Sequence, residues 1–227
     1  MASKYRVGID QSLSCTGVCV IDENDTVVSI FNVPTFPNII QMANKAIKDE
    51  TRTMYLVNRD NPYMPDLVRW DMDKDKLVTV KPLTKFTKDE KNSLKLSVET
   101  RLSYITDRIS DRLSPYINDI TEVTLEGISY GSLGQTATLG QVLGFIGGYL
   151  DRYIKGVVLT TATPMSLKSF AGVLKGKHKY SKDAMRYAMK SNFSVSYDIM
   201  LSHNKDIKNL DKFDDMVDAF YLALIPT

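Results

Sequence analysis

GIDQSLSCTGVCVID, residues 8–22, places a carboxylate, Asp10, at the point where one apolar run stops and a turn of small polar residues begins. Runs rich in Val and Ile cover residues 5–10, 15–22 and 26–33, and the turn-like segments QSLS and ENDT separate them. Short β-branched runs between turn residues predict strands. We therefore expect an antiparallel meander of three strands, with Asp10 at the end of the first.

Strands and helices alternate after residue 95. Apolar residues three and four positions apart from Val98 to Tyr116 predict an amphipathic helix that ends near Pro115. The later apolar segments predict two more strands and three more helices. These strands lie at residues 122–127 and 156–162, and these helices at residues 131–154, 163–174 and 214–225. The order predicts an α/β chain with a mixed sheet.

Residues 34–95 differ from the rest of the chain in composition. They contain five prolines, dense mixed charge and only short apolar pieces. We interpret them as an insertion after the third strand of a single 227-residue domain. Some helix near residues 38–50 and a small hairpin are expected inside the insertion, to which the sequence assigns no function.

The composition excludes several classes of protein. Hydrophobic residues make up 43% of the chain, charged residues 25%, and the net charge is +2, which is ordinary for a globular domain. No run of about 18 apolar residues occurs, as a membrane-spanning helix would need, and no apolar segment follows the first positive charges. We expect a cytoplasmic protein without a membrane segment. Cys15 and Cys19 are expected to be reduced thiols outside any zinc cluster.

Four carboxylates interrupt apolar elements. Asp10 and Glu126 end two predicted strands, and Asp215 and Asp218 lie in the first turns of the predicted last helix, on one helical face. Taken singly, Asp10 is equally typical of a turn cap and Asp218 of a solvent-facing or capping acid. A helix N-terminus favours such acids by roughly 0.3 to 1 kcal/mol each. The combination of all four in one α/β chain is what indicates a shared site.

Clustered carboxylates repel one another unless cations share the site. Hard, oxygen-ligated Mg²⁺ or Mn²⁺ is what such a cluster would hold. Two such ions about 3.5 to 4 Å apart can activate water and stabilise a leaving oxygen in phosphodiester hydrolysis.

A basic segment supplies the matching charge for a polyanion. Phosphates of a nucleic acid are contacted by Lys and Arg, which release counterions on binding. The candidate contacts are Lys168, Lys175, Lys177, Lys179, Lys182, Arg186 and Lys190. The alternative for these residues is an ordinary solvated basic surface.

Four blocks in this order resemble the RuvC-type Holliday junction resolvases of the ribonuclease H-like superfamily. GIDQSLSCTGVCVID resembles the first strand, turn and second strand of the family, with Asp10 in the place of its first metal-binding acid. TLEGISYGSLGQTATLGQVLGFIGGYL puts Glu126 in the second place. DDMVDAFYLAL resembles the terminal helix, where Asp215 and Asp218 complete the tetrad.

TPMSLKSFAG and YSKDAM resemble the remaining block, whose two functional lysines fall on Lys168 and Lys182. The resemblance implies a ribonuclease H-like fold around a central five-stranded mixed sheet flanked by helices. It also implies a homodimer that grips a four-way DNA junction and nicks two symmetric strands, with two Mg²⁺ or Mn²⁺ ions per active site, leaving 5′-phosphate and 3′-hydroxyl ends. The helix over residues 135–153, with four glycines, would be the dimer seam.

The sequence departs from the family pattern in several places. Gln11 and Ser12 replace the usual Pro-Gly of the first turn. The base-wedging aromatic of the family falls on Ser129, so that Tyr130 beside it is the candidate for stacking on DNA. Asp214 is an alternative to Asp215 in the ligand set. The insertion has no counterpart in compact bacterial resolvases, which suggests a bacteriophage or viral source and hence the host cytoplasm.

Three other functions remain open at this stage. The first is a less selective nuclease of the same fold that cuts flaps, forks or other branched DNA. The second is an actin-like ATPase, whose phosphate loop also has an Asp between two hairpin strands, although its Gly-rich second half is missing here. The third is a binding module without catalysis, against which the four acids argue.

Overall fold

The computed structural model describes residues 4–34, 68–71, 76–79, 98–128, 136–172, 182–203 and 210–225. The chain divides into two compact units. Residues 1–33 and 106–227 form the first unit, and residues 34–105 form the second.

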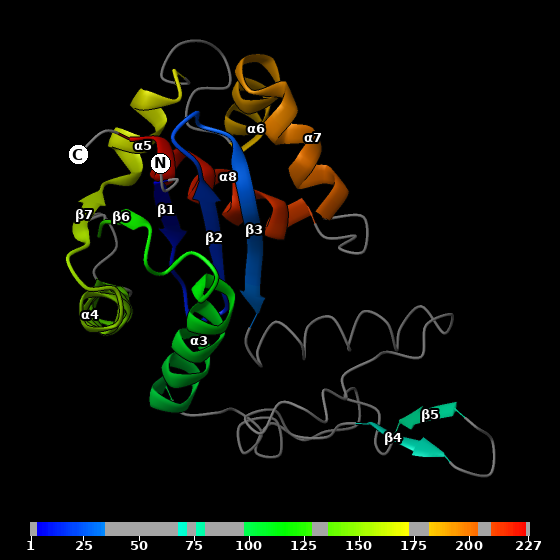
Figure 1. The fold of residues 1–227 in the computed structure, drawn as a ribbon. Coiled ribbons are helices and arrows are strands. Elements are labelled where there is room, and N and C mark those ends of the chain that lie inside the picture. The colour runs from blue at the N-terminus through cyan, green and yellow to red at the C-terminus, as the bar shows by residue number, and fades with distance from the viewer. Residues whose placement is uncertain are drawn as a thin grey trace. The chain divides into compact units, whose positions relative to one another are not determined.

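A five-stranded sheet with the strand order β3-β2-β1-β6-β7 forms the centre of the first unit (Figure 1). The strands are β1 (Tyr5–Asp10), β2 (Cys15–Ile21), β3 (Val27–Pro34), β6 (Ile120–Glu126) and β7 (Val158–Ala162). β1 pairs antiparallel with β2 and parallel with β6, and β6 pairs parallel with β7. The predicted mixed five-stranded sheet is thus confirmed.

Six helices are present in the described part of the chain. They are α3 (Val98–Leu113), α4 (Thr136–Tyr153), α5 (Pro164–Phe170), α6 (Lys182–Asn192), α7 (Ser194–His203) and α8 (Leu210–Leu224). None of these helices is both long enough and apolar enough to cross a membrane. The sequence analysis predicted neither α6, whose residues it treated as part of a basic segment, nor α7, whose apolar residues do not follow a clear helical stripe. It also placed the start of the last helix at residue 214, whereas α8 begins at Leu210.

Helix α8 packs on one face of the sheet, against β1 and β2. In Figure 1 these strands lie in front of α8. Side chains alternate between the two faces of a strand, so Gly8 faces α8 while Val7 and Ile9 are buried on the opposite face. There, a Cβ at Gly147 of α4 would lie 3.6 Å from the side chain of Leu125 on β6. The sheet is therefore covered on both faces.

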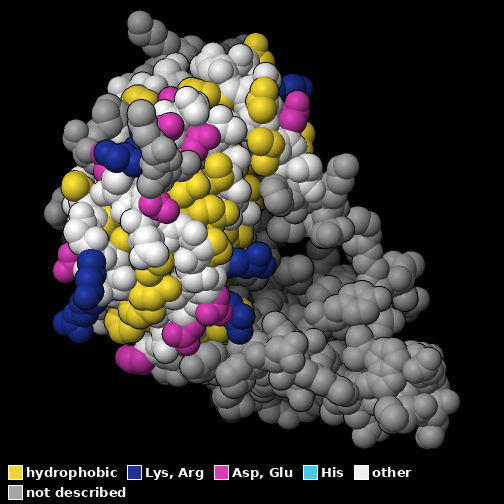
Figure 2. Space-filling view, viewed as in Figure 1, with side chains coloured by type: hydrophobic (Ala, Val, Ile, Leu, Met, Phe, Trp, Pro, Cys, Tyr) yellow, Lys and Arg dark blue, Asp and Glu magenta, His cyan; other side chains and the backbone are white. Residues whose placement is uncertain are grey.

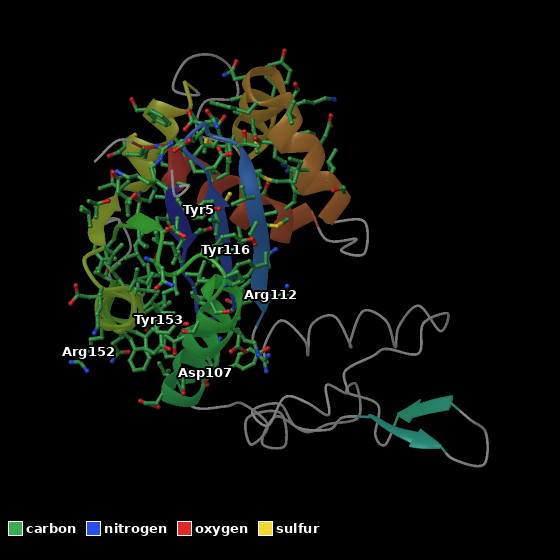
Figure 3. The ribbon with its side chains drawn as sticks, viewed as in Figure 1. Tyr5, Asp107, Arg112, Tyr116, Arg152 and Tyr153 are labelled. Atoms are coloured by element: carbon green, nitrogen blue, oxygen red, sulfur yellow. The ribbon has the colours of Figure 1, made fainter. Side chains whose placement is uncertain are left out.

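Hydrogen bonds join α4 to the part of α3 that belongs to the first unit. The hydroxyls of Ser110 and Tyr149 lie 2.6 Å apart, and the hydroxyl of Tyr153 donates to the carbonyl of Ser110 at 3.2 Å. Tyr149 and Tyr153 also stack, with ring centroids 5.6 Å apart. Figure 3 shows Tyr153 between the two helices. These contacts hold α4 in place over the sheet face opposite α8.

The second unit contains a short antiparallel hairpin, β4 (Val68–Asp71) paired with β5 (Lys76–Thr79). It lies within the predicted insertion, where a small hairpin was expected. The helix predicted near residues 38–50 falls outside the described residues.

Candidate active site

Asp10 and Glu126 meet at one edge of the sheet. β1 and β6 run parallel with Ile9 opposite Leu125, so the next residue of each strand is one of these two acids. Because the carboxyl ends of parallel strands open at the same sheet edge, binding sites commonly form there. A side-chain hydrogen bond joins Asp10 and Glu126. The parallel pairing of β1 and β6 thus brings the two strand-end acids together.

Two glycines let α8 bring further acids to the same edge. A Cβ on Gly8 would overlap the carbonyl oxygen of Ala219 and the amide nitrogen of Ala223. A Cβ on Gly17 would overlap the backbone carbonyl of Asp215, whose carbon it would approach to 2.6 Å. Gly17 is the cross-strand partner of Asp10. The helix backbone therefore rests directly on the strands, with Asp215 beside Asp10.

The charges of the four acids act on one another. Burial, followed by the charges of Glu126, Asp218 and Asp215, raises the pKa of Asp10 well above its ordinary value. Burial, followed by the charge of Glu126, raises the pKa of Asp218 to about 7. Burial also raises the pKa of Glu126, although its hydrogen bond with Asp10 acts in the opposite direction. Burial and the neighbouring charges thus favour the protonated form of this carboxyl pair.

The position of Asp215 and Asp218 within α8 differs from the prediction. Since α8 begins at Leu210, these acids lie in its second and third turns and not in the first. The favourable field of a helix N-terminus falls off within the first turn. A capping role therefore does not account for them. Both side chains are partly buried, and every other residue from Phe213 to Leu224 is buried, so an unpaired charge here is costly.

The donor chemistry of the four acids fits a hard divalent cation. Carboxylate oxygens are the preferred protein ligands of Mg²⁺ and Mn²⁺, and a cation would relieve the repulsion that raises these pKa values. Within the described ranges, however, no three or more His, Cys, Asp or Glu side chains are drawn together tightly enough to enclose an ion. The acids lie at one edge of the sheet, but those in the described ranges do not form a closed coordination shell.

Two lysines predicted from the sequence lie near the acids. Thr163 caps α5 by accepting a hydrogen bond from the Ser166 amide, and Pro164 is the first helical residue, as expected. In the last turn of α5, Lys168 has a positive charge that lowers the pKa values of Glu126 and Asp218.

Lys182, the first residue of α6, is the other lysine. Burial lowers its pKa, but the charges of Asp214, Asp215 and Asp218 raise it above the ordinary value.

Asp214 and Asp215 have different surroundings. Asp214 is buried, and its carboxylate lies 2.8 Å from Nε of Arg186 and 3.6 Å from Nζ of Lys182. Asp215 instead influences Asp10. This arrangement favours Asp215 over Asp214 as a ligand. Arg186, a predicted DNA contact, also pairs with Asp183 at 2.8 Å, so its charge is matched inside the protein.

Several predicted DNA contacts lie outside the described residues. They are Lys175, Lys177, Lys179 and Tyr130. Lys190, at the end of α6, is described and exposed. On the face shown in Figure 2, Lys and Arg side chains are scattered among Asp and Glu and do not form one basic patch.

Gln11 is a site residue that the sequence analysis missed. Its side-chain amide donates to the carbonyl of Glu126, and the Glu126 amide donates to its side-chain oxygen at 3.0 Å. In the sequence Gln11 stood out only as a departure from the family turn, since nothing local links it to a residue 115 positions away.

The stability of the protein without divalent cations is expected to fall as the pH rises. The folded protein keeps protons on Asp10 and Asp218 at a pH where an unfolded Asp, with a pKa near 4, has lost them. The contribution of Asp218 to the free energy of unfolding is thus complete below about pH 4 and is lost as the pH rises to about 7, by up to about 4 kcal/mol, and Asp10 changes stability in the same direction.

Thermal melts in EDTA between about pH 5 and pH 8 measure this decline, and Mg²⁺ or Mn²⁺ at the higher pH is expected to reverse it. A melting temperature that stays constant or rises with pH would contradict the cluster of raised pKa values.

The chain matches no protein-family model, and no curated protein is significantly similar to it. Among solved structures it is similar to Thermus thermophilus RuvC in complex with a Holliday junction substrate. That match has a TM-score of 0.52 and 13% sequence identity, and it covers 97% of this chain and 90% of the other. A second structure of Thermus thermophilus RuvC matches with a TM-score of 0.49, 13% identity and coverage of 97% and 91%. The first match shows that the chain has a RuvC-like, ribonuclease H-like fold.

Proposed function

We propose that the protein is a metal-dependent endonuclease that resolves four-way DNA junctions by paired, symmetric nicks. The observation that carries this proposal is the convergence of Glu126, Asp215 and Asp218 on Asp10 at the carboxyl ends of β1 and β6. It occurs in a fold similar to that of a RuvC solved with a Holliday junction substrate. The fold alone does not fix an activity, so the acids supply the chemical part of the argument.

In this proposal the four acids are the metal ligands. Asp10, Glu126, Asp215 and Asp218 would hold two Mg²⁺ or Mn²⁺ ions. When bound, such ions supply an activated water and stabilise the leaving oxygen of the phosphodiester, which leaves 5′-phosphate and 3′-hydroxyl ends.

Lys168 would contact the phosphate being cut, because its charge already acts on Glu126 and Asp218. Lys182, held beside Asp214, would contact a neighbouring phosphate.

A homodimer would supply two such sites for two strands. In α4 the buried stripe Val142, Ile146 and Leu150 faces the protein. A Cβ added at Gly144 or Gly148 would meet no other atom within 4 Å. These glycines therefore leave room for the close approach of a second helix, which supports α4 as the dimer seam.

The selectivity of nicking tests this function. Matched four-way junction, fork, flap and linear duplex substrates are incubated with the protein in Mg²⁺ or Mn²⁺. We expect the junction to be cut at least about 10-fold faster than the linear duplex, since its shape is what a symmetric dimer would recognise. A cruciform plasmid is expected to become linear with little nicked intermediate, because both strands are cut within one complex.

Equal cutting of all four substrates would instead favour the alternative, a less selective branched-DNA or flap nuclease of the same fold. Accumulation of singly nicked plasmid would contradict the paired sites.

A further inference from the structure

The side chain of Gln11 binds the backbone of Glu126 through both of its polar groups. Its Nε2 donates to the Glu126 carbonyl, and its Oε1 accepts from the Glu126 amide at 3.0 Å. The residue is 5% exposed, although Gln is rarely so buried. A buried carboxamide needs such partners, because an unpaired polar group costs about 1 to 3 kcal/mol.

The contact adds one pair of hydrogen bonds beyond the backbone ladder of β1 and β6. The ladder of β1 and β6 ends with Ile9 opposite Leu125, and β1 itself ends at Asp10. The Gln11 carboxamide then offers one donor and one acceptor to Glu126, as a peptide group of a neighbouring strand would. The backbone of Glu126 is thereby held in line with β1, although the chain after Asp10 has turned away from the sheet.

The turn that follows Gln11 is itself fixed by hydrogen bonds. The Thr16 hydroxyl donates to the Ser12 carbonyl at 2.9 Å, and the Cys15 amide donates to the Ser12 hydroxyl at 3.0 Å. Thr16 is completely buried. Gln11 therefore lies between a paired strand and a closed turn, which limits the positions its side chain can take.

Glu126 is consequently held at three points. Ala162 of β7 pairs with its main chain on one side, Gln11 holds its main chain on the side of β1, and the Asp10 carboxyl hydrogen-bonds its side chain. Removal of the Gln11 contact would leave the Glu126 main chain paired with β7 but no longer held to the segment that follows Asp10. The separation of the Asp10 and Glu126 carboxylates would then be set less tightly.

We infer that Gln11 is a positioning residue that sets the Asp10–Glu126 pair at the spacing needed to bind a divalent cation. It acts through the Glu126 main chain, and its role rests on the function proposed above. Groups that orient metal ligands typically change affinity or activity by about 10- to 100-fold when they are removed.

The test compares Gln11→Met with Thr16→Val. The Met side chain has nearly the same length as Gln but makes neither hydrogen bond, whereas Thr16→Val removes buried hydrogen bonds of the same turn without touching Glu126. Three quantities are measured for each protein: the melting temperature in EDTA, the Mn²⁺ dissociation constant by calorimetry, and the Mn²⁺ concentration that gives half-maximal junction nicking.

We expect Gln11→Met to weaken Mn²⁺ binding and to raise the half-maximal Mn²⁺ concentration by about 10-fold or more. Thr16→Val should lower the melting temperature to a similar degree and leave both Mn²⁺ values within about 2-fold of wild type. Gln11→Leu also removes both hydrogen bonds and adds no charge beside the acids, so it should weaken Mn²⁺ binding in the same way. It replaces the Met variant if that protein does not fold.

Unchanged Mn²⁺ values in the Gln11 variants, or equal shifts in Thr16→Val, would overturn the inference. Failure of the proposed function has a different signature. In that case the wild-type protein binds Mn²⁺ without cutting any junction, and the calorimetric comparison still decides the role of Gln11. A wild-type protein that binds no Mn²⁺ would overturn both.

Discussion

Gly8→Ala is expected to lower the free energy of unfolding by more than about 3 kcal/mol, a larger effect than overpacking usually produces. The added methyl would overlap main-chain atoms of Ala219 and Ala223, and Cβ of Leu222 would lie only 2.9 Å away. β1 is paired on both sides and cannot retreat, so α8 must lift. The melting temperature of a chain of this size should then fall by about 6 °C or more.

The lifted helix would also move Asp215 and Asp218 away from Asp10. Nicking by any Gly8→Ala protein that still folds is therefore expected to be lost. The matched control is Gly147→Ala in α4, where the new Cβ would make an ordinary contact 3.6 Å from Leu125. That variant should be neutral or more stable by up to about 1 kcal/mol, because Ala favours a helix over Gly. Equal destabilisation by both substitutions would refute the direct packing of the α8 backbone on β1.

Asp218→Asn is expected to stabilise the fold and to abolish nicking. The pKa of Asp218 is raised to about 7 by burial and by Glu126, so at about pH 8 the folded protein carries an unfavourable charge there. An amide of the same shape removes that charge and should raise the free energy of unfolding in EDTA by about 1 to 3 kcal/mol. Below about pH 4 the gain should disappear, since Asp218 is then protonated in both the folded and the unfolded protein.

Thermal melts at both pH values measure this gain, with Asp198→Asn on the exposed side of α7 as the control that should change little. A less stable Asp218→Asn protein at about pH 8 would mean that favourable contacts hold this carboxylate. The cluster would then be a structural network and not a site that trades stability for function.

The first strand and its acid could be predicted from sequence because the relevant signals are local. The Val and Ile run of residues 5–10 ends at Asp10, and β1 has the same bounds. The start of α5 could be predicted for the same reason, since the Thr163 side chain caps the helix and Pro164 fits its first position. Parallel pairing of β1 and β6 brings the two strand-end acids together, whereas the sequence predicted a mixed sheet without saying which strands pair.

Features that depend on tertiary contacts could not be predicted. The presence of α7 depends on packing, because its local sequence gives a weak helical signal. Asp214 and Asp215 are neighbours with the same side chain. Only the position of α6 separates the acid that pairs with Arg186 from the one beside Asp10.

Gln11 carries no local signal at all. Its partner is the main chain of Glu126, and main-chain partners leave no mark on the sequence. The role of the glycines could be predicted only in part. The glycines of α4 predicted close approach by another element, whereas the closest backbone contacts are those of α8 with Gly8 and Gly17 in the strands.

The central claim is that the four acids form a cation-dependent phosphodiesterase site. Its most direct test is the initial rate at which a synthetic four-way junction is nicked in Mg²⁺ or Mn²⁺, for the wild-type and Asp218→Asn proteins side by side. We predict nicking by the wild type that EDTA abolishes, and a rate at least about 1,000-fold lower for the folded variant, equivalent to roughly 4 kcal/mol of transition-state stabilisation. Unchanged nicking by Asp218→Asn, or undiminished nicking by the wild type in EDTA, would contradict it.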